Sequence, residues 1–262
     1  MKEKKLDYGN WVPGNMMHLL WGITALLAIA NILNFCIFTN IAADVILLCM
    51  LLLSTGMSVY MQICRNMFAY EKGGLMGRIH DYLLEHLNWN GEGNLLEIGC
   101  GAGALSIKCA KRYPRARITG MDYWGKSWNY AREQCENNAE LEGVGNRITF
   151  QKGDAAKLDF PDNTFHAAVS NFVFHEVKSQ PDKHYVVREA LRVVKKGGVF
   201  VFHDMFEQKQ LYGNMNDFIK ELKQEGITEI HYIPNTDRES FIPGFLRAPW
   251  MLKDMGLIYG IK

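Results

Sequence analysis

The nine residues LLEIGCGAG (95–103) set the architecture that we expect for most of this chain. Two leucines and a carboxylate lead into three glycines at alternate positions, Gly99, Gly101 and Gly103. Glycine lets the backbone turn sharply and approach a ligand closely, and the first turn of a following helix presents free amide groups. The stretch therefore predicts a buried strand, a ligand-binding loop and a helix, in that order.

Strand-like and helix-like patterns alternate around this loop. Strands are expected at 93–99, 116–122, 147–154, 165–172, 199–205, 227–233 and 256–262, and helices at 75–87, 104–114, 128–143, 184–198 and 216–226. The alternation predicts an α/β fold with a Rossmann-like, doubly wound sheet of seven strands, mostly parallel, whose last strand is antiparallel. Ligands of such sheets bind beyond the carboxyl ends of the strands.

Two apolar segments precede this α/β region, at about 19–38 and 41–63. The first has no charged residue and the second has only Asp44, near its start. Each is long enough to cross the hydrocarbon core of a bilayer, so the pair predicts a transmembrane helical hairpin. A buried helical hairpin in a soluble protein is the alternative. A signal peptide fits poorly, because a second apolar segment follows at once.

Basic residues flank the two apolar segments on their outer sides only. They are Lys2, Lys4 and Lys5 before the first segment and Arg65, Lys72 and Arg78 after the second, with none between. Because cytoplasmic flanks carry the excess of Lys and Arg, we expect a multi-pass membrane protein with both termini in the cytoplasm. We expect residues 1–67 to form the membrane hairpin, residues 68–262 a cytoplasmic domain, and residues 70–76 a hinge between them.

Composition argues against two functional classes. The 262 residues carry a net charge of +1, which does not suit a protein that wraps nucleic acid electrostatically, and we expect no nucleic-acid partner. The six cysteines include no C-x-x-C pair and have no histidines at metal-ligand spacing. We therefore expect reduced, mostly buried cysteines and no metal site.

The glycine loop by itself fits more than one cofactor. Gly99, Gly101 and Ala104 satisfy the dinucleotide pattern G-x-G-x-x-A, and Asp122 ends the second expected strand, where a carboxylate can accept ribose hydroxyls. An NAD-dependent oxidoreductase is thus one alternative. Glu97 favours another cofactor, since an acceptor at the start of the loop suits an ammonium group better than a pyrophosphate. Asp154, after the third expected strand, suits an adenine amino group.

Five stretches together resemble the class I S-adenosylmethionine-dependent methyltransferases. They are LLEIGCGAG, GMDYW (120–124), KGDA (152–155), the segment 157–177 and the segment 191–204. The resemblance implies S-adenosylmethionine as cofactor and assigns roles to nine residues. Gly99, Gly101 and Gly103 shape the pocket for the methionine moiety, and Glu97 supports the loop or the ammonium group. Asp122 binds ribose, Asp154 and Ala155 contact adenine, and Asn171 lies beside the methyl group. Tyr123 either packs against adenine or belongs to the core.

Methyl transfer from a sulfonium is an in-line displacement, so few residues need be catalytic. His175 is the candidate base, because imidazole accepts protons near neutral pH; the alternative is that it only hydrogen-bonds backbone. His203 and Asp204 follow the fifth expected strand and either contact substrate or cap the strand end. The segment 231–252 either forms part of a substrate lid or packs irregularly on the sheet.

The apolar hairpin bears on the methyl acceptor. A tether raises the concentration of the domain near anything in the bilayer, which favours a lipid-like or other small-molecule acceptor at the cytoplasmic membrane face. A protein or other macromolecular acceptor is an alternative, as is a non-catalytic scaffold that binds S-adenosylmethionine.

Overall fold

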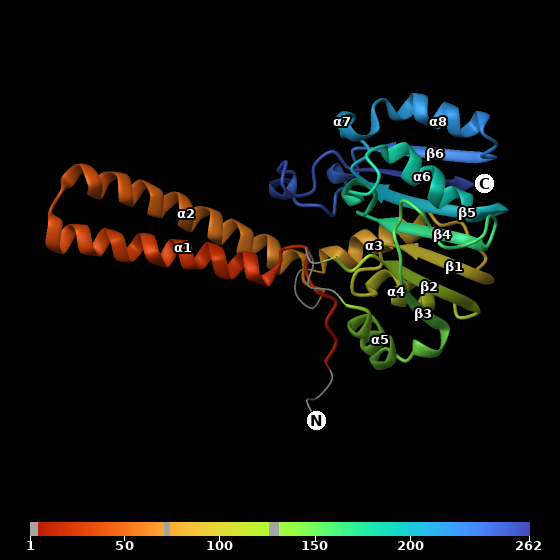
Figure 1. The fold of residues 1–262 in the computed structure, drawn as a ribbon, viewed down its shortest axis with the longest axis horizontal. Helices are drawn as coiled ribbons and strands as arrows, with labels where there is room; N and C mark the ends of the chain where they lie inside the picture. Colours follow the sequence, from red (N-terminus) through yellow and green to blue (C-terminus); the bar gives the residue numbers. More distant parts are fainter. Residues whose placement is uncertain (1–4, 71–73, 126–130) are drawn as a thin grey trace. The chain divides into compact units, whose positions relative to one another are not determined.

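The computed structural model describes residues 5–70, 74–125 and 131–262. By their contacts these residues divide into two compact units. One spans residues 9–76, and the other comprises residues 77–262 together with the described residues that precede Gly9 (Figure 1). The expected hinge at 70–76 includes residues 71–73, which lie outside the described range.

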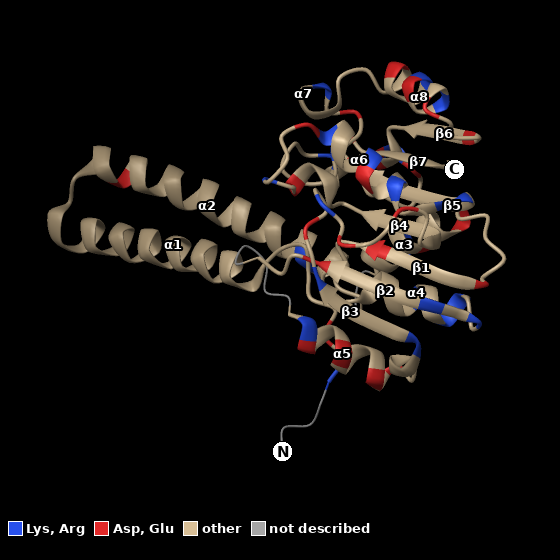
Figure 2. Ribbon diagram, turned by 45° about the vertical axis from the view of Figure 1, so that its right-hand side comes forward, with Lys and Arg blue, Asp and Glu red and all other residues tan. Residues whose placement is uncertain are grey.

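The first unit is a helical hairpin. Helix α1 (Gly14–Leu33) continues into a π-helical turn, η1 (Asn34–Phe38), and α2 (Ile41–Phe68) runs back beside it. Both helices are long and apolar enough to cross a membrane. Figure 2 shows them almost free of charged residues. Their large apolar side chains are exposed, with Leu26 at 68% and Leu53 at 76%, which disfavours a core hairpin of a soluble protein.

Polar side chains within the hairpin form hydrogen bonds with one another. Thr24 Oγ1 lies 2.7 Å from Ser54 Oγ and 3.1 Å from Ser58 Oγ, so hydroxyl groups join the two helices. At the turn, Asn34 Nδ2 donates to Asp44 Oδ1 at 2.6 Å. Because hydrocarbon offers no water to polar groups, such pairing is what a membrane-spanning hairpin requires.

The second unit is built on a seven-stranded sheet. Its strands are β1 (Gly93–Ile98), β2 (Ala116–Asp122), β3 (Ile148–Lys152), β4 (Phe165–Asn171), β5 (Val194–Asp204), β6 (Glu229–Pro234) and β7 (Gly256–Ile261). They are ordered β3-β2-β1-β4-β5-β7-β6. Strands β1 to β5 are parallel, and β7 is antiparallel to both of its neighbours. The predicted fold class and sheet topology are confirmed.

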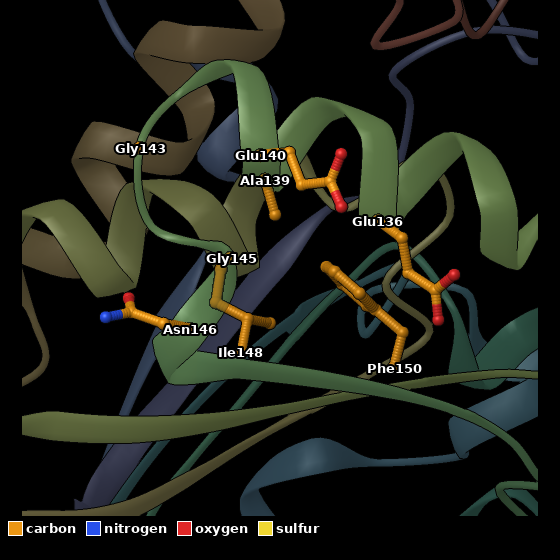
Figure 3. Close-up of a pocket in the computed structure, with 8 residues that line it drawn as sticks. All are labelled: Glu136, Ala139, Glu140, Gly143, Gly145, Asn146, Ile148 and Phe150. Carbon is orange, nitrogen blue, oxygen red and sulfur yellow. The ribbon is translucent and has the colours of Figure 1, made fainter.

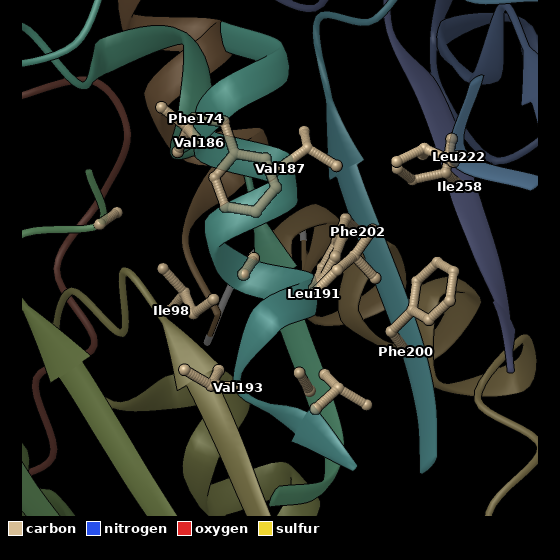
Figure 4. Close-up of a cluster of buried hydrophobic side chains, with 14 of the residues drawn as sticks. Ile98, Phe174, Val186, Val187, Leu191, Val193, Phe200, Phe202, Leu222 and Ile258 are labelled. Carbon is tan, nitrogen blue, oxygen red and sulfur yellow. The ribbon is translucent and has the colours of Figure 1, made fainter. Parts of the chain in front are cut away.

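Helices cover both faces of this sheet. They are α3 (Leu75–Glu85), α4 (Ala104–Arg112), α5 (Arg132–Leu141), α6 (Lys183–Arg192), α7 (Lys209–Tyr212) and α8 (Met215–Gln224). Alternate residues of β5 belong to two separate apolar cores, one on each face of the sheet. Phe200 and Phe202 join residues of α6 and α8 (Figure 4), whereas Val199 and Val201 join residues of α3, α4 and α5.

One expected helix is wrong in its last six residues. The structure ends α6 at Arg192 and begins β5 at Val194, so residues 194–198 belong to a strand. The β-branched Val193 and Val194 suit a strand, and the register between β4 and β5 shifts here. Gly198 allows the resulting close approach, because a Cβ there would lie 2.9 Å from Lys195 O.

Candidate functional site

The carboxyl ends of β1, β2, β3 and β4 bring the predicted site residues to one edge of the sheet. Backbone hydrogen bonds tie the loops there to one another. Gly99 N donates to Met121 O at 2.7 Å, and Gly153 N donates to Asp122 O at 2.9 Å. The loops after three neighbouring strands are therefore held side by side, at the edge where such sheets bind ligands.

The glycine loop adopts the conformation that its sequence predicts. Gly99, Gly101 and Gly103 have φ of 77°, 54° and 80°, in the left-handed region that favours glycine. Gly103 is the N-cap residue of α4. A Cβ on Gly99 would lie only 2.1 Å from Cγ2 of Val173, in the segment after β4. Glycine is thus required at 99 by a protein contact as well as by backbone conformation.

Replacing Gly99 by alanine is expected to destabilise the protein by about 2–4 kcal/mol, since it combines positive-φ strain with overpacking against Val173. Gly143→Ala is the matched control: its φ is 70°, but nothing lies within 4 Å of the added Cβ, so a loss of about 1 kcal/mol is expected. The measurement is the denaturation midpoint of the full chain in detergent. Equal losses in the two variants would contradict the contact with Val173, whereas partial recovery in Gly99→Ala/Val173→Ala would support it.

Glu97 lies buried beneath the loop. Its side chain is 3% exposed and accepts a hydrogen bond from Ser106 Oγ on α4. Burial raises the pKa of Glu97 to about 7, against the opposing effect of the Ser106 hydrogen bond. Of the two roles expected for Glu97, this contact corresponds to support of the loop, since it joins β1 to the helix after the loop.

Asp122 joins the loops after β1 and β2. Its Oδ2 accepts from Gly101 N at 2.8 Å, and its Oδ1 accepts from Trp124 N at 2.7 Å. Burial raises the pKa of Asp122, and these amide hydrogen bonds oppose that effect. The neighbouring Tyr123 ring is 63% exposed, with Lys152 Nζ 5.4 Å from its centroid. Each carboxylate oxygen retains a lone pair for a ligand hydroxyl.

Asp154 and Ala155 follow β3. Asp154 Oδ1 accepts from Ala156 N at 2.9 Å and from Ser179 Oγ at 3.0 Å, so this turn is tied to the segment between β4 and α6. Ala155 is 7% exposed. The two residues therefore lie at the same edge as Asp122, as expected.

His175 is held by a carboxylate. It lies in the turn η3 (Phe174–Glu176), and its Nδ1 is 2.9 Å from Oδ1 of Asp204 at the end of β5. Burial lowers the pKa of His175, but the charge and hydrogen bond of Asp204, with the charge of Glu176, outweigh it, so the pKa is raised. His175 therefore bonds to a carboxylate side chain, and not only to backbone groups as the alternative expected.

Asp204 has more partners than the sequence analysis indicated. It is fully buried, and it accepts from the backbone amides of Val173 (2.9 Å), Phe174 (2.7 Å) and Met205 (2.7 Å) and from Tyr212 OH at 3.2 Å. Burial raises the pKa of Asp204, but His175 and these amides outweigh it and lower the pKa. Asp204 thus caps the loop after β4 and also orients His175.

Asn171 and His203 pair on the face of the sheet opposite to Asp204. His203 Nδ1 lies 2.9 Å from Asn171 Oδ1, and its Nε2 lies 2.9 Å from Thr236 Oγ1, after β6. Burial lowers the pKa of His203 to about 4. The Oδ1 atom of Asn171 is therefore already bonded to the buried, neutral His203. A ligand that contacts this oxygen would share it with His203.

The depressed pKa of His203 predicts acid sensitivity. The unfolded chain binds a proton near pH 6.5 and the folded chain only near pH 4, so His203 should cost about 2 kcal/mol of stability between about pH 7 and 5. Glu97, whose folded pKa is raised, acts in the opposite sense over this range. The measurement is therefore a difference: His203→Gln should flatten the pH dependence of the thermal midpoint, and exposed His231→Gln should not. An unchanged slope in His203→Gln would contradict the assignment.

An open surface hollow lies in the same α/β unit but away from these loops, beside α5 and β3 (Figure 3). Its lining residues are Glu136, Ala139, Glu140, Gly143, Gly145, Asn146, Ile148 and Phe150. None of the predicted site residues lines it. The candidate site at the carboxyl edge is therefore formed by the loops there and their side chains, and not by this hollow.

Comparisons with known proteins identify relatives of this part of the chain. Residues 96–202 match the model of a family described as a methyltransferase domain. A sterol 24-C-methyltransferase of Aspergillus fumigatus is 33% identical over 122 residues, which are 46% of this chain and 30% of that protein. A phosphatidylethanolamine N-methyltransferase of Cereibacter sphaeroides is 37% identical over 121 residues, which are 46% of this chain and 54% of that protein.

The solved structure of the [4+2]-cyclase SpnF has the same fold. It matches with a TM-score of 0.52 and 22% identity, over 70% of this chain and 79% of that one. The chain spans about a third of the length of the sterol methyltransferases that it matches and about half of the phosphatidylethanolamine enzyme.

Proposed function

Residues 96–202 match a methyltransferase-domain family model, and on this basis we propose that the chain is a class I S-adenosylmethionine-dependent methyltransferase. We propose that it methylates a lipid-like or other small-molecule acceptor at the cytoplasmic face of a membrane. The observation that carries the proposal is the meeting of the glycine loop, Asp122 and Asp154 at the carboxyl edge of the sheet.

The residues at this edge fit S-adenosylmethionine by their chemistry. Asp122 has carboxylate lone pairs for the two ribose hydroxyls, and Asp154 has an acceptor for the adenine amino group. The exposed Tyr123 ring is suited to contact with adenine. The left-handed glycines leave room for the methionine moiety to approach the backbone. When bound, the cofactor supplies an electrophilic methyl group on its sulfonium.

The chain's own contribution to the chemistry is a base in a fixed orientation. Because Asp204 accepts the Nδ1 proton of His175, the lone pair of the neutral imidazole is on Nε2. His175 Nε2 would take the proton that an acceptor hydroxyl or amine loses as its heteroatom bonds to the methyl group. The Asp204 carboxylate then stabilises the imidazolium.

A lipid-like acceptor is supported by two independent facts. The chain contains two apolar helices of spanning length, and the proteins it resembles include enzymes named for sterol and phosphatidylethanolamine methylation. Because basic residues flank the hairpin on its outer sides only, we infer that both termini and the domain lie in the cytoplasm. A reporter fused to the C-terminus tests this topology, and a reporter active only on the outer side would contradict it.

Membranes that carry the full chain, supplied with methyl-labelled S-adenosylmethionine, test the acceptor class. After extraction, label in the organic phase that is absent from Asp122→Ala membranes would support a lipid-like acceptor. Label confined to the aqueous phase would contradict the lipid part of the proposal. Binding of the cofactor without transfer to either phase would contradict catalysis and favour a scaffold.

A further inference from the structure

We propose that residues 240–253, which lie within the connection between β6 and β7, form a surface that docks in the phospholipid headgroup region of a bilayer. The inference rests on the proposed membrane insertion of the hairpin. It goes beyond that insertion because it gives the α/β unit a second lipid contact, at the edge where the candidate site lies.

The sheet register places this segment at the carboxyl edge. Gly256 begins β7 and pairs with both Pro234, the last residue of β6, and Asp204, the last residue of β5. The chain between Pro234 and Gly256 therefore emerges beside the strand end that holds His175. Thr236, just before the docking segment, contacts His203, the residue before Asp204.

Within residues 240–253, apolar side chains point both inward and outward. Ile242, Leu246 and Leu252 are buried, so they anchor the segment on the unit. By contrast, Phe245 is 47% exposed and Trp250 is 62% exposed. The irregular packing that the sequence analysis considered is therefore present, but it leaves two large aromatic side chains in contact with solvent.

The charge of the segment complements phospholipid phosphates. Arg247 and Lys253 are exposed, and no Asp or Glu occurs between Glu239 and Asp254. Arg247 also donates from Nε to Asp237 O at 2.9 Å, which fixes its direction. Aromatic rings interspersed with cations are the composition that membrane interfaces accept, because the rings bury apolar area while the cations meet phosphates.

Both chain connections to the apolar helices leave the α/β unit at this same edge. Before the hairpin, Asp7 N donates to Asn138 Oδ1 at 2.9 Å, and Asn138 Nδ2 donates to Ala102 O of the glycine loop at 3.0 Å. After the hairpin, α3 passes the docking segment, where Tyr82 OH donates to Glu239 Oε1 at 3.1 Å.

The two chain connections between the α/β unit and the apolar helices are short. Five residues separate Tyr8 from the start of α1, and six separate the end of α2 from the start of α3. At about 3.5 Å per residue, neither connection reaches much beyond 20 Å. Exposed aromatic residues at an edge with two short tethers are suited to the headgroup layer of a bilayer.

Lipid quenching of Trp250 tests the proposal. The full chain is reconstituted in phosphatidylcholine and phosphatidylglycerol vesicles, with and without lipids brominated near the top of the acyl chains. Subtracting the fluorescence of Trp250→Phe from that of the original chain isolates the emission of Trp250. We expect brominated lipid to quench this component about two-fold and aqueous iodide to quench it weakly.

The matched control is Trp89→Phe, because Trp89 packs against Tyr113 and precedes β1 at the opposite edge of the sheet. Brominated lipid should not quench its difference spectrum. Quenching of Trp250 by iodide and not by brominated lipid would overturn the proposal, and a docked protein partner or a closed lid would be sought instead. Vesicle flotation after an alkaline wash reports hairpin insertion, and titration with S-adenosylmethionine reports cofactor binding, so failure of either earlier proposal is recognised separately.

Discussion

Asp122→Ala is expected to weaken binding of S-adenosylmethionine about 100-fold. The variant loses a carboxylate that would accept two ribose hydroxyls, and two charge-assisted hydrogen bonds contribute about 3 kcal/mol together. It also releases Gly101 N and Trp124 N, which hold the loops after β1 and β2. Isothermal titration of the full chain in detergent measures the change in Kd.

Asp182→Ala is the matched control for this loss of affinity. Asp182 also accepts from two backbone amides, those of His184 at 2.9 Å and Tyr185 at 3.4 Å, but it does so as the N-cap residue of α6. We expect its removal to lower stability without changing the Kd for the cofactor. A Kd unchanged in Asp122→Ala, or changed equally in both variants, would contradict the ribose role.

His175→Gln is expected to lower kcat by about 10²–10⁴ while leaving the affinity for S-adenosylmethionine unchanged, because the variant removes the base and not a cofactor contact. His166→Gln, at the amino end of the same strand β4, serves as control and should keep kcat. Rates come from transfer of labelled methyl groups in membranes. An unaltered kcat in His175→Gln would leave the imidazole with a structural role only.

The pH profile separates orientation of His175 by Asp204 from simple folding support. A base must be neutral to accept a proton, and the pKa of His175 is raised, so kcat should rise with pH through a value above about 6.5. Asp204→Asn removes the charge that stabilises the imidazolium, which should move this rise to lower pH and also lower kcat. A profile of unchanged midpoint in Asp204→Asn would contradict the pairing.

The sequence predicted which loops meet, because alternating strands and helices determine that their carboxyl ends share one edge. It did not identify the partner of His175, since that contact depends on tertiary structure. Alternation along β5 places Asp204 on the same face as Phe200 and Phe202, and this much is readable from the sequence. The turn after β4 could not be predicted from the sequence, because Phe172 adopts a φ of 63°, which a phenylalanine rarely takes.

The boundary between α6 and β5 was missed for a related reason. The residues after Arg192 continue a plausible helical pattern, and only pairing with β4 makes them a strand. The role of Glu97 was left open in sequence terms because the depth of its burial and its bond to Ser106 depend on where α4 packs. The catalytic role of His175 remains a prediction. So do the cofactor contacts of all nine residues to which the resemblance assigns a role, namely Glu97, Gly99, Gly101, Gly103, Asp122, Tyr123, Asp154, Ala155 and Asn171.

The hydrogen bonds of Asp7 with Asn138 make the α/β unit discontinuous in sequence: the hairpin is an insertion between its first few residues and its main body. A truncated version that lacks everything before α3 would therefore lose Asp7. The face of α5 that Asp7 contacts would be exposed, and Asn138 would lose one of its hydrogen-bond partners. Excising residues 9–76 and joining Tyr8 to Gly77 through a flexible glycine-serine linker follows the division of the chain into its two compact units. The two apolar helices thus interrupt the sequence of the α/β unit, and that unit can be engineered without them.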